Sequence, residues 1–320
     1  MRHYLYNCNG THFAMTSRGC PGTCNFCCNQ TLKSLAPGPW LRRRTPKNII
    51  EELKTVLKKY SCVSSFAFWD DSFLCCTSDW LNEFCELYKK EIGMQFFCNL
   101  HPREVTREKL KLLVDTGLTG IQMGLQTASD EVNTRIYNRK ASAEQFLEAT
   151  RSIDEFRDAI QDRHYHVIVD NPFESEAQTA ESVRLLSRIN RPFFLSRCAL
   201  TFYPATTITE RAFDEGIIDR ESNPVYHREY FEHSRAYLNL LMRLTPVIPQ
   251  GFIRLCLNYR RFLPVRMLFY LVYYGYFTPR YRYLNQFYLN WRRKKMFDKA
   301  PQSRKIQETL LREAIRYRAL

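Results

Sequence analysis

Short apolar runs alternate along the chain with longer stretches in which apolar residues recur every three or four positions. The short runs predict strands over 13–16, 65–69, 94–99, 120–125, 164–169 and 193–201. The longer stretches predict helices over 46–60, 79–92, 107–116, 142–160, 176–188 and 207–215. Thr45 and Thr106 are expected N-caps, and Gly117 is expected to end a helix. Six strand-then-helix units predict an α/β fold with a parallel sheet, either open or closed into an incomplete barrel.

The loops that follow the strands are expected to carry the chemistry of such a fold. The first of these loops holds Cys20, Cys24 and Cys27 in the pattern C-x3-C-x2-C. Three thiolates on one short loop can bind three irons of a cubane cluster and leave the fourth iron open to an outside ligand. A zinc site, which normally takes its fourth ligand from a second tight pair, and unrelated buried thiols are the alternatives. Cys28 is expected to be a packed thiol.

This loop, directly after the first strand of a (βα)6 pattern, resembles the signature of the radical SAM superfamily. Phe26 matches the aromatic residue usual before the last cysteine, and the resemblance covers residues 12–220. It implies a partial (βα)6 TIM-like barrel in which Cys20, Cys24 and Cys27 bind a [4Fe-4S] cluster, with S-adenosylmethionine on the fourth iron. It also implies a low-potential electron donor and a 5'-deoxyadenosyl radical that takes hydrogen from an organic substrate.

The same resemblance implies five further cofactor contacts. Asp70 and Asp71 stand where the superfamily usually has a Gly-Gly-Glu element for the methionine ammonium, and a solvated helix cap is their alternative. Gln126, in a Gly-Leu-Gln-Thr segment, is expected near the ribose or carboxylate of the cofactor, or is an ordinary hydrogen-bonding residue of the barrel edge. Arg139 and Asp170 are expected at strand ends facing the barrel mouth, or form a structural ion pair.

Paired aspartates and the Arg-Arg-Arg-Thr-Pro segment at 42–46 are similar to the catalytic half of cobalamin-binding-domain radical SAM proteins. Two departures stand out: Pro204-Ala205-Thr206 replaces the usual Pro-Gly-Thr, and no Asp-x-His-x-x-Gly motif occurs among the 320 residues. With only 19 residues before Cys20, this chain alone is not expected to bind cobalamin by that motif. Two interpretations of the chain stay open: a split or truncated relative, which includes an inactive fragment, and an enzyme that works without a corrinoid. Two reaction types also stay open, methyl transfer and another C–H modification.

Charge divides the chain into two parts. The 320 residues include 47 Lys and Arg against 33 Asp and Glu, a net charge of +14. The first 226 residues are neutral, whereas the last 94 carry 19 basic and 5 acidic side chains together with 19 aromatic ones. We therefore expect a core barrel over 1–225 and a basic, aromatic helical region over 226–320.

Three interpretations of the basic region stay open. Its helices pack on the barrel, or they lie on an anionic membrane surface, with a lipid-like substrate, or they bind nucleic acid. Combined with the cysteine loop, the last interpretation gives the alternative function, a zinc-stabilised nucleic-acid-binding protein.

The compartment follows from the N-terminus and the cysteines. No apolar run of signal-peptide length begins the chain, and the most apolar stretch, 262–277, is short and contains Arg266. No transmembrane helix is expected. Twelve cysteines in such a chain indicate reduced thiols and a cytoplasmic protein, with peripheral contact to the inner membrane face as an extension.

Overall fold

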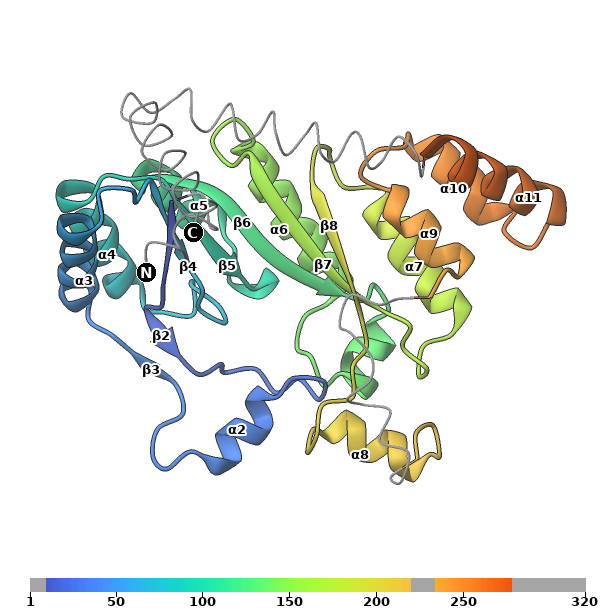
Figure 1. Ribbon diagram of the computed structural model, residues 1–320, viewed down its shortest axis with the longest axis horizontal. Coiled ribbons are helices and arrows are strands. Elements are labelled where there is room, and N and C mark those ends of the chain that lie inside the picture. Colours follow the sequence, from blue (N-terminus) through green and yellow to red (C-terminus); the bar gives the residue numbers. More distant parts are fainter. Residues whose placement is uncertain (1–9, 220–233, 278–320) are drawn as a thin grey trace, which may run out of the picture. The chain divides into compact units, whose positions relative to one another are not determined.

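The computed structural model describes residues 10–219 and 234–277 (Figure 1). One sheet of six strands, all parallel, follows the order of the chain. Its strands are β1 (Thr11–Ala14), β4 (Ser65–Phe68), β5 (Phe96–Leu100), β6 (Leu118–Gln126), β7 (Asp162–Val169) and β8 (Phe194–Ala199). β1 and β8 are the two edges, so the described residues form a partial barrel, as the alternation of strands and helices predicts.

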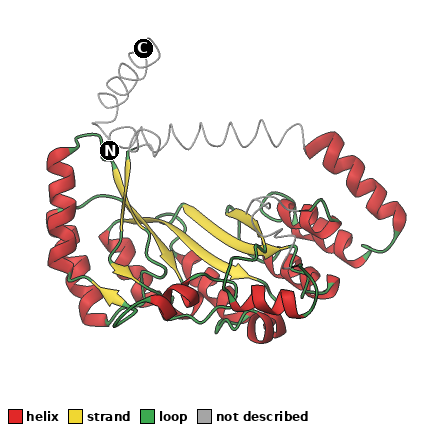
Figure 2. Cartoon of the chain, turned by 60° about the horizontal axis from the view of Figure 1, so that its bottom comes forward, coloured by secondary structure: helices red, strands yellow, loops and turns green. Residues whose placement is uncertain are grey.

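A helix follows each of these strands in the chain, and helices line one side of the sheet (Figure 2). In chain order they are α3 (Pro46–Lys59), α4 (Ser78–Glu91), α5 (Arg107–Thr116), α6 (Ala143–Glu155), α7 (Glu176–Leu186) and α8 (Thr207–Asp214). Thr45 and Thr106 cap α3 and α5 as expected, each accepting a backbone N–H with its side chain, and Gly117 ends α5 in the left-handed conformation at φ 118°. α6 ends five residues before its predicted end at 160, since the chain turns at Phe156.

The two faces of the sheet differ in burial. Along β7, Tyr165 and Val167 are buried on the face that the helices cover, whereas His164 and His166 are only partly buried on the opposite face. We call this opposite face the inner face. Rings fill the core on the helix side, where the phenyl group of Phe68 contacts the rings of Phe84, Tyr88 and Phe96 at centroid distances of 5.4–6.0 Å.

Three elements near the cysteines lie outside the predicted pattern. The two-residue strands β2 (Ser17–Arg18) and β3 (Arg42–Arg43) pair antiparallel, and α2 (Asn29–Leu35), which has no buried residue, lies between them in the chain. The cysteines follow β2 and precede α2. Elements of this length bury too little apolar surface to leave a periodic signal in the sequence.

The C-terminal residues divide between two compact units. The larger unit comprises Thr11–Arg254, and α9 (Tyr237–Leu244) packs against α7 within it. The other unit contains the described residues 255–277, with the end of α10 (Gln250–Asn258), α11 (Leu263–Val272) and a π-helical turn, Tyr273–Phe277. The expected boundary after residue 225 falls within 220–233, outside the described residues. No helix in the described part combines the length and apolar character needed to cross a membrane.

Candidate functional site

The three thiols of the cysteine loop influence one another electrostatically, and two of them lie beside Gly22. Gly22 lies between two of them: a Cβ added to this glycine would stand 3.3 Å from Cys20 Sγ and 3.9 Å from Cys24 Sγ. The amide of Gly22 donates to Cys20 Sγ at 3.3 Å, and the amide of Cys27 donates to the Cys24 carbonyl at 3.1 Å. The missing side chain at Gly22 thus leaves room among the sulfur atoms.

Burial sets the protonation of these thiols. It raises the pKa of Cys20 and Cys27 to about 11 and also raises the pKa of Cys24. Each of the three pKa values is raised further by the charge of another thiol of the set, which shows that the sulfurs lie within electrostatic reach of one another. Metal ligands have to be thiolates, so binding of a metal group would release these protons.

The donor set fits a cluster in which each cysteine serves a different iron. Within the described ranges, no three His, Cys, Asp or Glu side chains converge as ligands of one metal ion. Three partly exposed thiols on one loop, with Cys20 and Cys24 on either side of Gly22, match the one-thiolate-per-iron pattern of a cubane cluster better than a single-ion site.

The middle of the cysteine loop is bonded to the segment that connects β6 to α6. The amide of Asn25 donates to the Tyr137 carbonyl at 2.8 Å, and its side-chain amide donates to the Ile136 carbonyl at 3.0 Å. Thr23 and Asn138 exchange two hydrogen bonds of 3.1 and 3.2 Å. The loop is therefore held by residues more than a hundred positions away in the chain.

The segment after β8 holds the same loop from another side. The amide of Ile208 donates to the Asn25 carbonyl at 3.2 Å, and the Thr31 hydroxyl donates to the Ala205 carbonyl at 2.7 Å. Phe26 packs edge-on against Tyr137 with ring centroids 4.9 Å apart. Around Phe26, the apolar cluster comprises Val132, Ile136, Tyr137, Ile168, Phe173, Leu200, Phe202 and Ile208.

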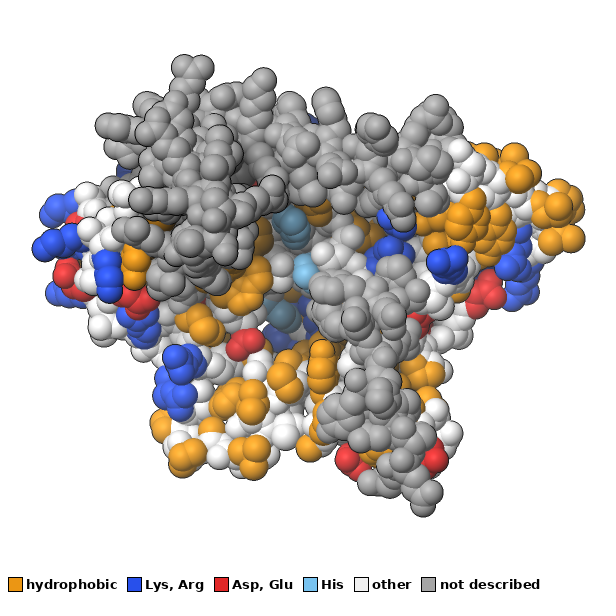
Figure 3. Space-filling model, viewed as in Figure 1, with side chains coloured by type: hydrophobic (Ala, Val, Ile, Leu, Met, Phe, Trp, Pro, Cys, Tyr) orange, Lys and Arg blue, Asp and Glu red, His pale blue; other side chains and the backbone are white. Residues whose placement is uncertain are grey.

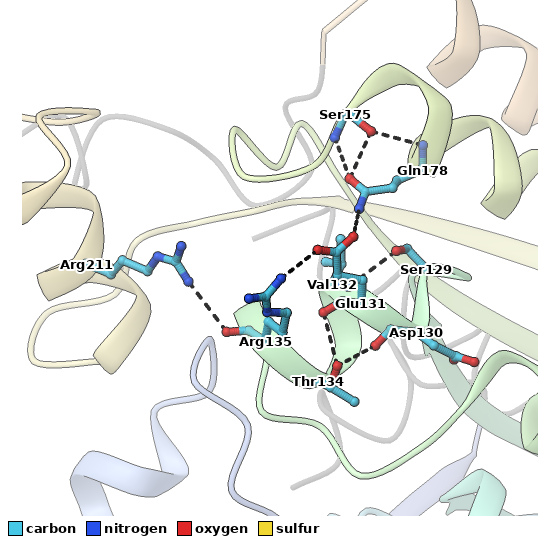
Figure 4. Close-up of polar contacts among 9 residues, drawn as sticks. All are labelled: Ser129, Asp130, Glu131, Val132, Thr134, Arg135, Ser175, Gln178 and Arg211. Carbon is cyan, nitrogen blue, oxygen red and sulfur yellow. Dashed lines mark hydrogen bonds and ion pairs between the residues drawn. The ribbon is translucent and has the colours of Figure 1, made fainter.

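A π-helical turn, η2 (Val132–Ile136), begins the β6–α6 segment and is tied to two helices (Figure 4). Glu131 accepts from Arg135 at 3.1 Å and from Gln178 of α7 at 3.1 Å. Arg211 of α8 donates to the Arg135 carbonyl at 3.5 Å. These contacts fix the segment on which the cysteine loop rests.

The two aspartates after β4 have different surroundings. Asp70 is fully buried: its carboxylate accepts from the Thr16 amide at 3.0 Å, from the Thr16 hydroxyl at 2.7 Å and from the Ser17 hydroxyl. Asp71 is exposed, accepts from the Asn29 side chain at 3.0 Å, and lies near enough to the cysteines to raise the pKa values of Cys20 and Cys27. Asp70 therefore fixes the start of the cysteine loop. Of the two aspartates, Asp71 is the one that lies near the thiols.

Gln126 and Arg139 lie together at the end of β6. The buried Arg139 guanidinium donates to the Leu125 and Gly124 carbonyls at 2.7 and 2.6 Å. Burial lowers the pKa of Arg139 to about 10, while the nearby Cys24 raises it. Gln126 has a positive φ of 68°, and its side-chain amide folds back over Gly124, where an added Cβ would be 2.4 Å from Gln126 Nε2. A side chain at 124 would require this amide to move.

Asp170 has contacts of another kind. Its carboxylate accepts from the amide of Ser234 at 2.6 Å and from the side-chain amide of Asn239 at 2.7 Å. These partners join the end of β7 to the segment entering α9. The structure thus brings Asp71 and Arg139 near the cysteines, keeps Gln126 beside Gly124 at the end of β6, and directs Asp170 toward α9.

Three partly buried imidazoles were not predicted as site residues. Burial lowers the pKa values of His101, His164 and His166 to about 4, and the positive charge of Arg139 lowers that of His101 further. They are therefore neutral at physiological pH. The alternation along β7 placed His164 and His166 on one face of a strand; His101 had no signal beyond its position directly after β5. Figure 3 shows histidine side chains at the centre of the view, next to apolar side chains.

A row of rings crosses the inner face between the two edge strands. Phe13 of β1 packs on Trp69, which stacks on Phe97 of β5, and centroid distances are 5.1 and 6.0 Å. Phe97 contacts His164 of β7 at 5.9 Å, and His164 stacks on Phe194 of β8 at 4.8 Å. We call these five residues the ring row.

The ring row passes over β6 at Gly120. A Cβ added there would lie 2.6 Å from Cδ2 of Phe97 and 2.9 Å from the Cβ of Asp162. Real Cβ atoms do not approach so closely, so a side chain at 120 would displace the phenyl ring or the neighbouring strand. Glycine at this position keeps the row continuous.

Comparisons with known proteins show what this chain resembles. The anaerobic magnesium-protoporphyrin IX monomethyl ester cyclase of Rubrivivax gelatinosus is 23% identical over 204 residues, which are 62% of this chain and 34% of the cyclase. This chain thus spans about a third of that relative's length.

Two solved structures share the fold. The radical S-adenosylmethionine methyltransferase TsrM of Kitasatospora setae, solved with its tryptophan substrate and an S-adenosylmethionine analogue, has a TM-score of 0.56 at 15% identity. The match covers 67% of this chain and 40% of TsrM. The cobalamin-dependent enzyme OxsB has a TM-score of 0.53 at 15% identity, over 94% of this chain and 54% of OxsB. This likeness confirms the partial TIM-like barrel.

Residues 15–186 match the family model of the Radical SAM superfamily, which is more than half of the chain. The match favours an enzyme over the alternative of a zinc-stabilised nucleic-acid-binding protein. The cofactors of this superfamily are a [4Fe-4S] cluster and S-adenosylmethionine, and TsrM has also been solved with cobalamin and its cluster. The chain belongs to the radical SAM superfamily.

Proposed function

We propose that this chain binds a [4Fe-4S] cluster through Cys20, Cys24 and Cys27, cleaves S-adenosylmethionine reductively and modifies a C–H bond of an organic substrate. The observation that carries the proposal is the set of three partly exposed thiols, two of them beside Gly22, on a loop held from two other strand ends. When bound, the cluster and S-adenosylmethionine supply a 5'-deoxyadenosyl radical, given one electron from a low-potential donor.

The chain's own residues take distinct parts in this proposal. Asp71 accepts from the ammonium group of S-adenosylmethionine, because the carboxylate of Asp70 is already engaged by Thr16 and Ser17. Gln126 presents its amide to the cofactor beside the fixed guanidinium of Arg139. Asp170, an expected cofactor contact, positions the end of β7 through its bonds to the α9 side.

The ring row supports a substrate with a flat conjugated ring, in preference to a lipid-like molecule. Stacked and edge-on aromatic contacts favour another π-system over an alkyl chain. His166, which is neutral, offers a hydrogen bond without a charge to desolvate, whereas Nε2 of His164 is already bonded to Asp162 at 2.6 Å. Tryptophan, named as the substrate of TsrM, and the protoporphyrin named for the cyclase are both ring compounds.

The test compares two neighbouring cysteines. Anaerobically reconstituted protein should contain iron and sulfide and release 5'-deoxyadenosine from S-adenosylmethionine under dithionite. Cys24→Ala should abolish this release, whereas Cys28→Ala, at an exposed cysteine outside the motif, should keep it. Release that continues in the Cys24 variant, or a colourless zinc protein, would show that the assignment is wrong.

The cysteines also indicate the cellular compartment of the enzyme. We assign the enzyme to the reducing cytoplasm, since a chain with twelve cysteines, of which the eleven described ones form no disulfide with one another, is typical of a reducing compartment. Peripheral contact with an anionic membrane surface is part of the same assignment, and the C-terminal helices supply its structural basis.

A further inference from the structure

The end of α10 and the whole of α11 expose an unusual amount of apolar side chain. Isolated exposed apolar residues are normal, but a contiguous group of this size marks an interaction surface. Eight large apolar side chains between residues 255 and 274 are 44–70% exposed. We call them the apolar helix face: Leu255, Tyr259, Phe262, Leu263, Met267, Leu268, Leu271 and Tyr274.

The spacing along α11 shows two apolar stripes. Leu263, Met267 and Leu271 recur every four residues and form the exposed stripe, whereas Phe269 and Tyr273 are 2% and 4% exposed on another side. Phe269 and Tyr273 pack their rings together at 5.8 Å. One stripe is thus buried, and the second is exposed in the part of the chain that the structure describes.

Charge decides what the partner is. No Asp or Glu occurs from residue 234 to residue 297, whereas Arg260, Arg261 and Arg266 adjoin the exposed stripe. A second copy of the same surface would bring like charges together. Nucleic acid would complement the positive charge, but it would give no apolar partner to leucine and methionine side chains.

Anionic phospholipid complements both the positive charge and the exposed apolar side chains. Its headgroups attract arginine, at on the order of 1 kcal/mol for each basic residue near the surface, and the acyl boundary accepts apolar side chains. α11 has ten residues, and at 1.5 Å per residue it is about 15 Å long, half the thickness of a bilayer core. A helix of this length lies in the interface and does not span it.

We propose that the apolar helix face inserts into the interface of an anionic membrane and docks the enzyme there. The inference deepens the peripheral contact assigned above and does not depend on the cluster chemistry. It names the surface, the side chains that insert and the lipid charge that is required.

Vesicle sedimentation of the full chain tests the inference. The chain should bind vesicles of phosphatidylcholine mixed with phosphatidylglycerol and should bind phosphatidylcholine alone weakly. Leu268→Asp with Leu271→Asp should lower the binding about 10-fold to 100-fold, because two inserted leucines are lost. Leu35→Asp, at a leucine that is 74% exposed on α2, is the matched control and should bind like the parent chain.

A substitution that adds positive charge distinguishes insertion of the leucine into the membrane from purely electrostatic attraction to it. Leu271→Lys adds a positive charge, so it should strengthen binding if only charge matters and weaken it if the leucine inserts. Stronger binding would therefore overturn the inference, as would equal binding to neutral vesicles or unchanged binding of the double aspartate variant. RNA binding without vesicle binding, or a dimer that Leu271→Asp dissociates, would assign the face to another partner and would also overturn it. Cofactor cleavage, measured in parallel with dithionite, should be the same in all these variants, so failure of the cluster assignment remains distinguishable.

Discussion

Removal of the Asp70 carboxylate should unfold the start of the cysteine loop, although Asp70 contributes no ligand to the cluster. The side chain is fully buried and accepts two hydrogen bonds from Thr16 and one from Ser17. In Asp70→Ala the two hydroxyls can rotate toward other acceptors. The Thr16 amide cannot move, because its segment precedes β2, which is paired with β3.

The magnitude follows from these bonds. A hydrogen bond to a charged group contributes about 1.5–3 kcal/mol, and a buried donor without an acceptor costs about 1–3 kcal/mol. With one donor left unsatisfied and two partly rescued, Asp70→Ala should lower the free energy of unfolding by about 3–5 kcal/mol. For a unit of this size, that corresponds to a fall in melting temperature on the order of 10 °C.

Asp71→Ala is the matched control, since it deletes the same group one residue away. Asp71 is exposed and has one bond, to Asn29, so its loss should change the free energy of unfolding by less than about 1 kcal/mol. Thermal unfolding and iron content after reconstitution should fall together for Asp70→Ala. Asp71→Ala should keep its iron and lose affinity for S-adenosylmethionine. Equal stability of the two variants would refute the distinction between them.

Three further substitutions test other parts of the site. Gly120→Val should lower substrate affinity while 5'-deoxyadenosine release continues, because the valine displaces the ring row. A substrate-binding assay and a turnover assay measure the two effects. Gly251→Val, where an added Cβ meets no atom within 4 Å, is the control and should leave both unchanged. Arg139→Gln should make the midpoint potential of the cluster more negative in an EPR-monitored titration, because the buried cation beside a cluster thiol stabilises the reduced state. Arg151→Gln, at an exposed arginine, should not shift this potential. Burial raises the pKa of Glu174 from 4.5 to about 7, so the folded chain keeps a proton that the unfolded chain releases in this interval. Denaturant titrations should show stability falling as pH rises through that window, by up to about 3 kcal/mol, and Glu174→Gln should abolish this fall.

The strands and helices of the barrel were predictable because several local signals agree in them. Around α3, the apolar periodicity, the Thr45 cap and the proline at the first helical position all give the same start, and the structure begins α3 at Pro46. Gly117 likewise ends α5 where a residue with positive φ is needed. β6 and β7 are long enough for their alternation to show which side chains share a face.

Tertiary contacts decide the features that the sequence did not reveal. Asp70 and Asp71 are neighbours of one residue type, and only their distance from Thr16 and from the cysteines separates their roles. The ring row draws one residue from each of five segments, none of which is distinctive alone. Gly120 illustrates the same point, because its need for a missing side chain arises from a phenyl ring on the adjacent strand.

Placement of the cysteine loop follows from the same long-range contacts. β1 lies at the edge of the sheet, so the loop after it has a neighbouring strand on one side only. Bonds from Asn25 to the β6–α6 segment and from Ile208 back to Asn25 replace the missing support. The C-x3-C-x2-C spacing therefore fixes which atoms can bind the irons, while residues over a hundred positions away fix where those atoms stand. A chain that kept the three cysteines but lost the β6–α6 segment and the segment after β8 would still contain the ligands. Their sulfur atoms would no longer be held in the positions that a cluster needs.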